Sequence, residues 1–434
     1  MRLSLGFPTT ALFAIGLIAQ SGSSRRWALT ETDRLHLPVL QKRPIPKTLP
    51  QPISATEYAA PLTRNALVSA MGGSITVGDL NGDSLPDLFV AVPGGVNALL
   101  RNNGNGMFED VTSKARVYGV KNSLSATFAD YDNSGHQSLF VAGVGGVLLY
   151  HNNGNGKFSD FTKVAGLRRG PGEVCTRALV SDFDGDGFPD LLLTVYTDLN
   201  QPPAKTSFVF PNDFGGATTR LFRNDGKGSF TDITAASGLS GNPGRARNAI
   251  IADFNSDHHP DLLILRDDKP PALYLNRGNG NFVDATWDAG DELTGHAFFD
   301  GLAADFNGDG KPDLALWSTV SFRILLNDGK GKFKNMAAPS IVPPSNLFGF
   351  RGVVADFSGT GFPGVLTSDS SGCWHLLTNE VRRFTQVPLS LPSLAGSVAG
   401  TSLFDRSRKA LYLLALRPDG SITALESIAV SATK

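Results

Sequence analysis

Four short segments place oxygen-bearing side chains at alternate positions of a turn-rich loop. The copy that begins at Asp305 reads Asp-Phe-Asn-Gly-Asp-Gly-Lys-Pro-Asp-Leu, so its first, third, fifth and ninth positions offer carboxylate or amide oxygens. Glycine at its fourth and sixth positions permits a sharp turn, which brings these oxygens and the carbonyl of the seventh position to one concave side. A hard cation with six to eight oxygen ligands, such as calcium, requires this kind of arrangement.

Three further copies begin at Asp79, Asp182 and Asp253. Zinc and copper prefer nitrogen or sulfur ligands and magnesium tolerates flexible cages poorly, so the pattern favours calcium at about four sites. Without a cation the neighbouring carboxylates repel one another, and we expect an empty loop to be loose. The predicted ligands, in which the seventh position of each loop offers its backbone carbonyl, are Asp79, Asn81, Asp83, Leu85, Asp87, Asp182, Asp184, Asp186, Phe188, Asp190, Asp253, Asn255, Asp257, His259, Asp261, Asp305, Asn307, Asp309, Lys311 and Asp313.

Three weaker copies complete the series. The copy at Asp130 keeps Asp132 but has serine at its fifth and ninth positions, so it predicts a weak fifth site or an empty loop. The copy at Asp356 has serine, threonine and glycine at its third, fifth and ninth positions, and we expect it not to bind a cation. An eroded last copy centres on Asp405. A single such motif arises by chance or as a capped turn, whereas four strong copies at regular spacing leave that explanation little weight.

The loops recur at intervals of 49 to 52 residues, apart from one interval of 71 between Asp182 and Asp253. A second motif, Asn-x-Gly-x-Gly-x-Phe, follows each of the first five loops. Asparagine and glycine both accept positive φ, so this motif predicts a hairpin turn between two strands. The five turns begin at Asn102, Asn152, Asn224, Asn276 and Asn327.

Short apolar runs flank the loops and turns, such as Leu88 to Val92 and Leu191 to Tyr196. A strand therefore enters and leaves each Asp loop, and another enters and leaves each hairpin turn. Four strands in a period near 50 residues are typical of a propeller blade, which buries its faces only against other blades. The sequence predicts an all-β fold, a seven-bladed β-propeller of four-stranded antiparallel blades. We expect the segment after Pro52 to supply an outer strand that closes the ring.

The chain divides into three predicted regions. Residues 1–24 combine a basic start, an apolar stretch from Leu3 to Ala19 and small residues, which predicts a signal peptide or an uncleaved signal anchor. Residues 25–52 contain five prolines and predict an extended tether. Residues 53–434 form the propeller. We therefore expect an exported protein, secreted, at the cell surface or in the periplasm, that meets a membrane only through an uncleaved anchor.

Composition excludes several classes of protein. The 434 residues carry a formal net charge of −1 and contain no basic stretch, which argues against a nucleic-acid partner. The two cysteines, Cys175 and Cys373, cannot form a disulfide framework and have no zinc-like spacing to histidine. We interpret them as isolated thiols.

The paired motifs, Asp-Phe-Asn-Gly-Asp-Gly-x-Pro-Asp-Leu and Asn-x-Gly-x-Gly-x-Phe, resemble the FG-GAP/VCBS repeat family, which includes the integrin α-subunit propeller. The resemblance covers roughly residues 70 to 430, and the repeats are also similar to those of ASPIC/UnbV-type proteins. It implies a seven-bladed propeller with calcium in several loops, used for adhesion or ligand recognition. The chain departs from the family at the Phe-Gly and Gly-Ala-Pro elements, of which Val92-Pro93-Gly94 is the nearest trace, so no specific ligand carries over.

The functional hypothesis is a scaffold or assembly module that binds a protein or carbohydrate ligand. The insertion from Thr197 to Thr218, rich in Phe, Pro and Gly, is the candidate contact segment, and the alternative, which we favour slightly, is that it folds over its own blade. The alternative is a hydrolase or polysaccharide lyase with an active site assembled between blades. None of the seven histidines lies in a catalytic motif, and only His296 has several acidic neighbours in the sequence.

Overall fold

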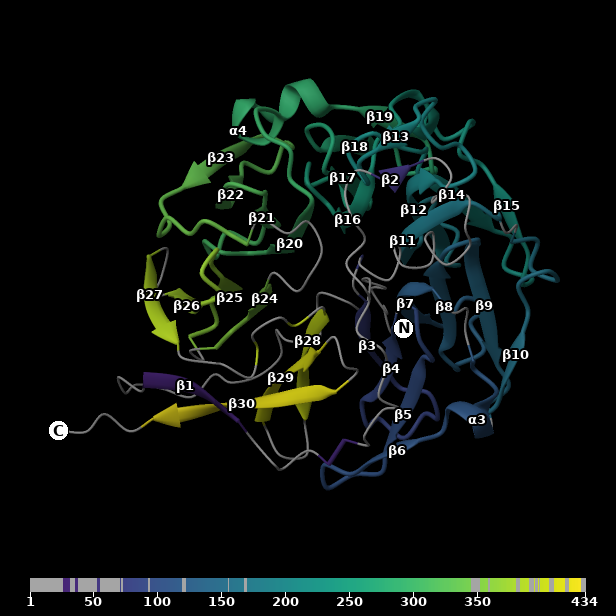
Figure 1. Cartoon of the computed structure of the whole chain (residues 1–434), viewed down its shortest axis with the longest axis horizontal. Coiled ribbons are helices and arrows are strands. Elements are labelled where there is room, and N and C mark those ends of the chain that lie inside the picture. Colours follow the sequence, from purple (N-terminus) through teal and green to yellow (C-terminus); the bar gives the residue numbers. More distant parts are fainter. Residues whose placement is uncertain are drawn as a thin grey trace.

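Seven four-stranded antiparallel sheets stand around a central axis (Figure 1), which confirms the predicted architecture. In the computed structural model the described residues are 26–31, 36–37, 53–54, 71 and 73–430, with gaps at 93, 119–121, 155, 168–169, 345–351, 358–359, 380–382, 390–393, 395–396, 398, 406–409 and 418–420. Across this part of the chain, no helix has both the length and the apolar character needed to cross a membrane.

Each blade starts at its inner strand and ends at its outer strand. Blades 1 and 2 comprise β3 (Ser74–Gly78), β4 (Asp87–Ala91), β5 (Ala98–Asn102) and β6 (Phe108–Asp110), then β7 (Ser123–Ala129), β8 (Ser138–Gly143), β9 (Gly146–Asn152) and β10 (Phe158–Asp160). Blades 3 and 4 comprise β11 (Glu173–Ser181), β12 (Asp190–Asp198), β14 (Arg220–Asn224) and β15 (Phe230–Asp232), then β16 (Ala246–Ala252), β17 (Asp261–Arg266), β18 (Ala272–Asn276) and β19 (Phe282–Asp284).

The remaining blades repeat this plan. Blades 5 and 6 comprise β20 (Asp300–Ala304), β21 (Asp313–Trp317), β22 (Phe322–Asn327) and β23 (Phe333–Met336), then β24 (Gly352–Ala355), β25 (Gly364–Ser368), β26 (Trp374–Asn379) and β27 (Phe384–Leu389). Blade 7 comprises β28 (Ala399–Asp405), β29 (Ala410–Leu416), β30 (Ile422–Val430) and β1 (Arg26–Glu31). Short helical segments, α3 (Thr112–Ala115), η1 (Leu239–Gly241), η2 (Thr286–Ala289) and α4 (Asp291–Thr294), lie between blades.

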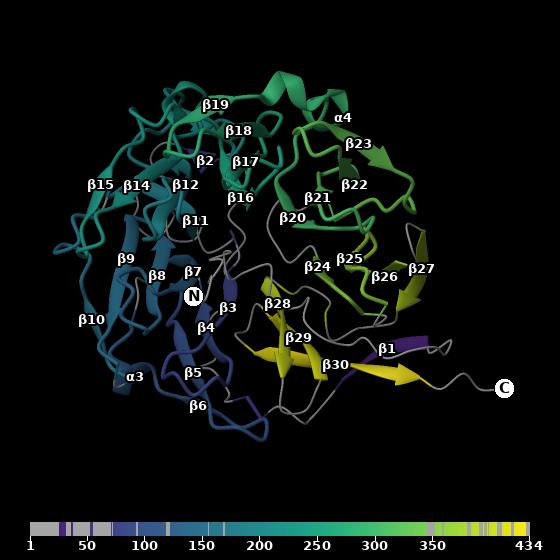
Figure 2. The same ribbon diagram turned by 180° about the vertical axis from the view of Figure 1, so that it is seen from behind.

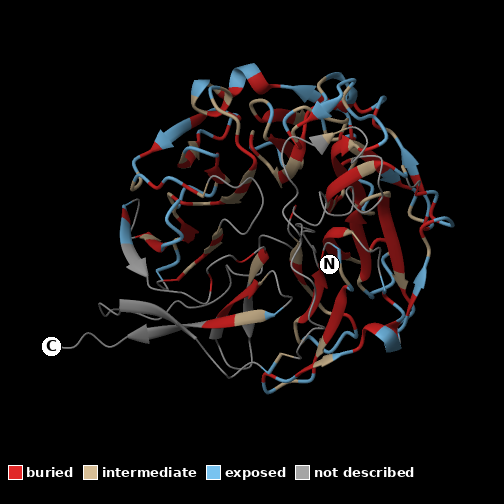
Figure 3. Cartoon of the chain, viewed as in Figure 1, coloured by how far each residue is buried: buried red, intermediate tan, exposed pale blue. Residues whose placement is uncertain are grey.

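The core lies between neighbouring blades. The second strand of a blade is buried on both faces, as in β4 and β21, where all five residues are buried. One core cluster joins Phe89 of blade 1 to Phe128 of blade 2, and Figure 3 shows buried residues in the middle strands with exposed residues at the rim. Because each blade covers its neighbour, these strands read as continuous apolar runs rather than as alternating patterns.

The connections fall on two opposite faces of the disc. The Asp loops join first to second strands and the Asn-x-Gly-x-Gly turns join third to fourth strands, so both lie on one face, the Asp-loop face. The second-to-third connections and the links between blades lie on the other, the connection face. Figure 2 shows the ring from behind the view of Figure 1.

The ring closes through the N-terminal part of the chain. Strand β1 pairs antiparallel with β30, with Arg26 opposite Val430, and becomes the outer strand of blade 7. The expectation that the closing strand follows Pro52 is therefore wrong, and this part of the segment expected to be a tether is a strand. Residues 26–31 contain no proline, so nothing prevents their backbone from joining the ladder. The predicted signal, residues 1–24, lies outside the described residues.

Candidate metal centres and the loops that hold them

The first aspartate of each loop shapes the turn. Asp305 accepts hydrogen bonds on Oδ1 from the backbone N–H groups of Gly308 (2.6 Å) and Asp309 (3.1 Å), and on Oδ2 from that of Gly310 (2.8 Å). Both glycines have positive φ, at 74° and 79°. The loop at Asp253 keeps this backbone although its equivalent residues are Ser256 (φ 62°) and His258 (φ 68°). The carboxylate at position one thus organises the loop even where the sequence lacks glycine.

The ninth-position aspartate ties the loop to the hairpin turn. Asp313 is fully buried, and its Oδ2 and Oδ1 accept hydrogen bonds from the N–H groups of Phe306 (3.0 Å) and Asn327 (2.8 Å). Burial raises the pKa of this carboxyl to about 7, aided by the nearby Asp309 and opposed by the two backbone hydrogen bonds. The same two bonds and a pKa raised by burial to about 7 recur at Asp87, Asp190 and Asp261.

The third position adds oxygens that are partly buried in three of the four loops, and the fifth position adds exposed ones. In the loop at Asp182, ligand atoms of Asp182, Asp184 and Asp190 all lie within 4.8 Å of one another, the one such group of acidic, histidine or cysteine residues in the described part of the chain. Burial, and then the adjacent Asp186, raise the pKa of Asp184. The other three strong loops have asparagine at position three, as in Asn255. The loop at Asp182 therefore concentrates the most negative charge and is the best-formed candidate for a cation site.

In two of the asparagine-containing loops the amide supports the fifth position. Asn81 Nδ2 donates to Asp83 Oδ2 at 2.9 Å, and Asn255 Nδ2 donates to Asp257 Oδ2 at 2.8 Å. In the loop at Asp305, Asn307 Oδ1 instead accepts from the N–H of Asp309 at 2.8 Å. Each loop thus gathers its predicted side-chain ligands on one short turn. Their coordination of calcium stays a prediction.

The seventh-position side chains have a role that the sequence analysis missed. A Cβ on the first glycine of the hairpin turn would lie 2.5 Å from Phe188 at Gly226 and 2.4 Å from His259 at Gly278. At the corresponding turns, Lys311 and Leu85 are the nearest neighbours of the equivalent glycines, at 2.8 and 3.8 Å. All four glycines have positive φ, and Gly226 and Gly278 are also needed for room, because the seventh-position ring lies over the turn. The predicted ligand role of the seventh-position carbonyls stays a prediction.

The asparagines of five hairpin turns link adjacent blades. Asn152 Nδ2 donates to Gln137 O in its own blade (2.9 Å) and to Leu80 O in the preceding blade (2.8 Å). Asn379, which begins a turn without the glycine motif, donates in the same way to Phe306 O at 2.8 Å. The equivalent bonds to the preceding blade run from Asn224 to Tyr131 O, Asn276 to Phe183 O and Asn327 to Phe254 O. In the sequence, asparagine recurs at the first turn position, but this recurrence does not show that its side chain reaches the preceding blade.

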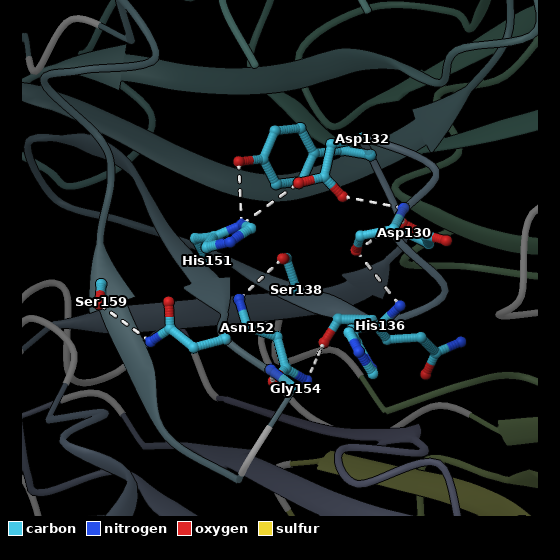
Figure 4. Close-up of polar contacts among 12 residues, drawn as sticks. Asp130, Asp132, His136, Ser138, His151, Asn152, Gly154 and Ser159 are labelled. Atoms are coloured by element: carbon cyan, nitrogen blue, oxygen red, sulfur yellow. Dashed lines mark hydrogen bonds and ion pairs between the residues drawn. The ribbon is translucent and has the colours of Figure 1, made fainter. Parts of the chain in front are cut away.

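The loop at Asp130 keeps its shape without carboxylates at positions five and nine (Figure 4). Asp130 accepts from the N–H groups of Ser134 (2.9 Å) and Gly135 (2.8 Å), while Asp132 Oδ2 lies 3.4 Å from His151 Nδ1. Ser138, at position nine, is buried, and its Oγ accepts from the N–H of Asn152 at 3.0 Å. A histidine therefore stands close to the one remaining extra carboxylate in this loop.

The loop at Asp356 also keeps the turn. Its first aspartate accepts from the N–H groups of Thr360 (3.1 Å) and Gly361 (2.7 Å). The third-position serine lies outside the described residues. The absence of carboxylates at positions five and nine leaves few oxygens for a cation, so its expected lack of binding stays a prediction.

The long insertion folds over its own blade. Phe208, Phe210 and Phe214 are buried, and the ring centroids of Phe208 and Phe210 each lie 5.3 Å from that of Phe214. Strand β13 (Ser207–Phe208) pairs with β2 (Ile53–Ser54), so the segment after Pro52 adds a strand here instead of closing the ring. Of the two alternatives for this insertion, packing is the one observed, because its aromatic side chains share a buried cluster with Val174 and Tyr196 of the same blade.

Two of the described histidines are hydrogen-bonded to neighbouring side chains, and both cysteines are free thiols. His296 Nε2 lies 2.8 Å from Arg323 Nη2, and both ring nitrogens of His375 are hydrogen-bonded, to Asp369 (2.7 Å) and Gln386 (2.8 Å). Both Cys175, which is buried with its pKa raised by burial, and Cys373, which is exposed, are free thiols.

Comparison with curated proteins finds partial relatives. A segment of 119 residues is 33% identical to human "Cartilage acidic protein 1", and one of 120 residues is 32% identical to the mouse protein. Each match covers 26% of this chain and 18% of the relative, so the matching segment spans less than a fifth of those proteins.

Comparison with solved structures finds matches of low sequence identity. An Agrocybe aegerita lectin that recognises non-reducing terminal N-acetylglucosamine is 18% identical, with a TM-score of 0.48, and the match covers 80% of this chain and 86% of the lectin. A structure of BBS1N in complex with ARL6DN is 11% identical, with a TM-score of 0.49, covering 84% of this chain and 94% of that one. These values carry no information on a ligand.

The repeat itself gives the family. The FG-GAP-like repeat matches residues 79–141, 131–193, 208–264, 253–316 and 305–367, which together make up more than half of the chain. The matched segments contain all the strong Asp loops, the loop at Asp130 and the five glycine-containing turns. The chain belongs to the FG-GAP-like repeat family.

Proposed function

We propose that this protein is an exported propeller whose Asp loops bind calcium and whose connection face binds a protein partner. The observation that carries the proposal is the recurrence of one carboxylate set, held in the same backbone turn, in four blades. Export rests on the sequence of residues 1–24.

Calcium binding follows from the charge of the loops. Asp182, Asp184, Asp186 and Asp190 bring four carboxylates to one turn, and no lysine or arginine forms an ion pair with them among the described residues. A divalent cation would relieve their mutual repulsion and satisfy their free lone pairs. Because the ninth-position carboxylate also contacts the hairpin turn, the bound cation would stiffen both turns of the blade.

A partner on the connection face is supported by the exposed apolar side chains. Most of the large apolar residues that the described structure exposes lie in connections on this face: Val96, Tyr118, Val164, Trp287, Val320 and Val342. Exposed apolar and aromatic residues are enriched at contact sites between proteins. Trp287, in η2, is 87% exposed, far more than a structural tryptophan requires.

A carbohydrate ligand is the second candidate, and Trp287 is the observation that favours it. An indole ring exposed next to the carboxylate of Asp288 offers both a flat apolar surface and hydrogen-bond acceptors, which suit a sugar ring. We propose binding rather than catalysis, because none of the seven histidines lies in a catalytic motif of the sequence.

Calorimetric titration of the chelator-treated full chain with calcium tests the proposal. We expect about four calcium ions per chain, with affinities of about 10⁻⁴ to 10⁻³ M typical of extracellular sites. Asp184→Ala should remove one ion, whereas Asp132→Ala, in the degenerate loop, should leave the number of the stronger sites unchanged. Equal loss in both variants, or no binding by the wild-type chain, would contradict the proposal.

A further inference from the structure

Two arginines lie at irregularities in adjacent inner strands. The register of β11 shifts between Cys175 and Arg177, and that of β16 shifts between Ala246 and Asn248, across Arg247. Bulges of this kind re-aim side chains and are frequent beside functional sites. Both shifts occur near the start of the strand, toward the connection face, and both strands border the axis (Figures 1 and 2). Thr176 Oγ1 donates a hydrogen bond to Ala246 O at 2.8 Å, so the residues that precede Arg177 and Arg247 lie side by side.

Arg247 packs against an aromatic ring, and the residue after it, Asn248, holds the carboxylate of Asp300 by a hydrogen bond. Its guanidinium carbon lies 5.1 Å from the ring centroid of the buried Phe299, a cation–π contact. Asp300, which follows Phe299 in the chain, accepts a hydrogen bond on Oδ1 from Asn248 Nδ2 at 2.9 Å. Asp300 also acts electrostatically on Arg177, as the acidic group that favours its charged form.

Arg177 is charged, half-buried and poorly neutralised. Its guanidinium makes one hydrogen bond, from Nη1 to Thr176 O at 3.3 Å, and no carboxylate in the described structure lies within ion-pair distance of it. The nearby Arg245 is the contrast, since its Nε lies 2.6 Å from Asp267 Oδ1 and three backbone carbonyls accept hydrogen bonds from its Nη1. A guanidinium in a partly desolvated place is stabilised by an anion that accepts its fork of N–H groups.

We propose that Arg177 is the anchor of a ligand site at the propeller axis, beside Arg247 and toward the connection face, that takes a carboxylate group. A single negative charge matches the net charge of +1 on Arg177, Arg247 and Asp300, whereas a dianion such as sulfate would meet stronger repulsion from Asp300. The planar carboxylate also fits the guanidinium through two parallel hydrogen bonds. This site does not depend on calcium in the Asp loops.

Titration of the full chain with sodium acetate and with sodium glucuronate, with chloride adjusted to keep ionic strength constant, tests this site by calorimetry. We expect saturable millimolar binding that is at least tenfold weaker in Arg177→Gln and partly kept in Arg177→Lys, which retains the charge but loses the fork. Arg101→Gln is the matched control, because Arg101 lies in β5 and pairs with Glu109 at 2.7 Å. This control should bind like the wild type.

Asp300→Asn keeps the test decisive if Arg177→Gln fails to fold. Removing the competing carboxylate should tighten acetate binding several-fold, a gain that misfolding cannot imitate. If a glutamate-rich peptide competes with acetate in the wild type but not in Arg177→Lys, a partner's side chain is the source of the carboxylate. Unchanged binding in Arg177→Gln and Asp300→Asn, or sulfate binding as tightly as acetate, would overturn the proposal.

Discussion

The Asp loops of blades 2 and 3 have the same backbone turn but different numbers of carboxylates. Both use their first aspartate to accept the N–H groups of the loop, as Asp130 and Asp182 do. Blade 3 then adds three carboxylates, whereas blade 2 has Asp132 beside His151 and a serine at position nine. The comparison shows that one residue gives the loop its shape and that the other positions decide whether it needs a cation.

The two loops should differ most in how much stability is lost when the residue at position nine is replaced. Asp190→Ala leaves the buried N–H groups of Phe183 and Asn224 without their acceptor, which should lower the free energy of unfolding by roughly 2–6 kcal/mol. Ser138→Ala removes one acceptor and should cost roughly 1–3 kcal/mol. Urea unfolding of both variants, at saturating EGTA, measures this. Equal costs would show that position nine does not link loop and turn in blade 3.

The pH dependence of stability should follow the ninth-position carboxyls. Burial raises the pKa of Asp190 in the folded chain to about 7, above its unfolded value, so the folded state holds the extra proton. The stability this group contributes is therefore complete below about pH 4 and is lost as the pH rises through 7. In EGTA, melting between pH 5 and 8 should show this decline, and Asp190→Asn should reduce its slope.

Calcium should reverse that decline, because the cation stabilises the ionised carboxylate and competes with the proton. Ser138→Ala is the control in blade 2, and its slope should equal that of the wild type. A wild-type melting temperature that is independent of pH in EGTA would mean that the ninth-position aspartates are ionised when folded.

Loss of the hydrogen bond between blades should lower the free energy of unfolding equally in blade 2 and in blade 3. Asn152→Ala and Asn224→Ala each remove a side-chain amide that donates to the preceding blade, so each should cost roughly 1–3 kcal/mol with or without calcium. Chemical denaturation in calcium and in EGTA checks this. A cost that depends on calcium in only one blade would contradict the view that this contact belongs to the fold.

The smallest effect should come from the histidine of blade 2. His151 Nδ1 lies 3.4 Å from Asp132, and both side chains are partly exposed, so His151→Gln should change the free energy of unfolding by about 0–1 kcal/mol. The same variant should leave calcium binding unchanged. A large calcium-dependent effect would place a cation at this loop.

Local features of this fold could be predicted from the sequence, and long-range ones could not. The Asp loops and glycine turns depend on residues within ten positions of one another, so Asp305 to Asp313 could be interpreted directly. The pairing of Arg26–Glu31 with β30 joins opposite ends of the chain, and nothing in either segment identifies its partner. The propeller was predictable because its period repeats, whereas its closure occurs once.

The sequence predicted which residues form the Asp loops, but it did not predict the contacts that these loops and turns make with neighbouring blades. The spacing of Asp182, Asp184 and Asp190 predicted their common turn, and these three carboxylates do lie together. The reach of Asn224 into the preceding blade could not be derived, because it depends on how blades pack. The same holds for Arg177, whose strand begins with an irregularity that no local pattern marks.

Thermal unfolding of the chain, including residues 26–31, in millimolar calcium, in EGTA, and in EGTA with magnesium tests the central claim most directly. At ten times its dissociation constant, each filled site adds about 1.4 kcal/mol, so several sites should raise the melting temperature clearly. We predict a rise that is specific to calcium and smaller in Asp184→Ala, but not in Asp132→Ala. An identical melting temperature in calcium and EGTA would show that the Asp loops are turns alone.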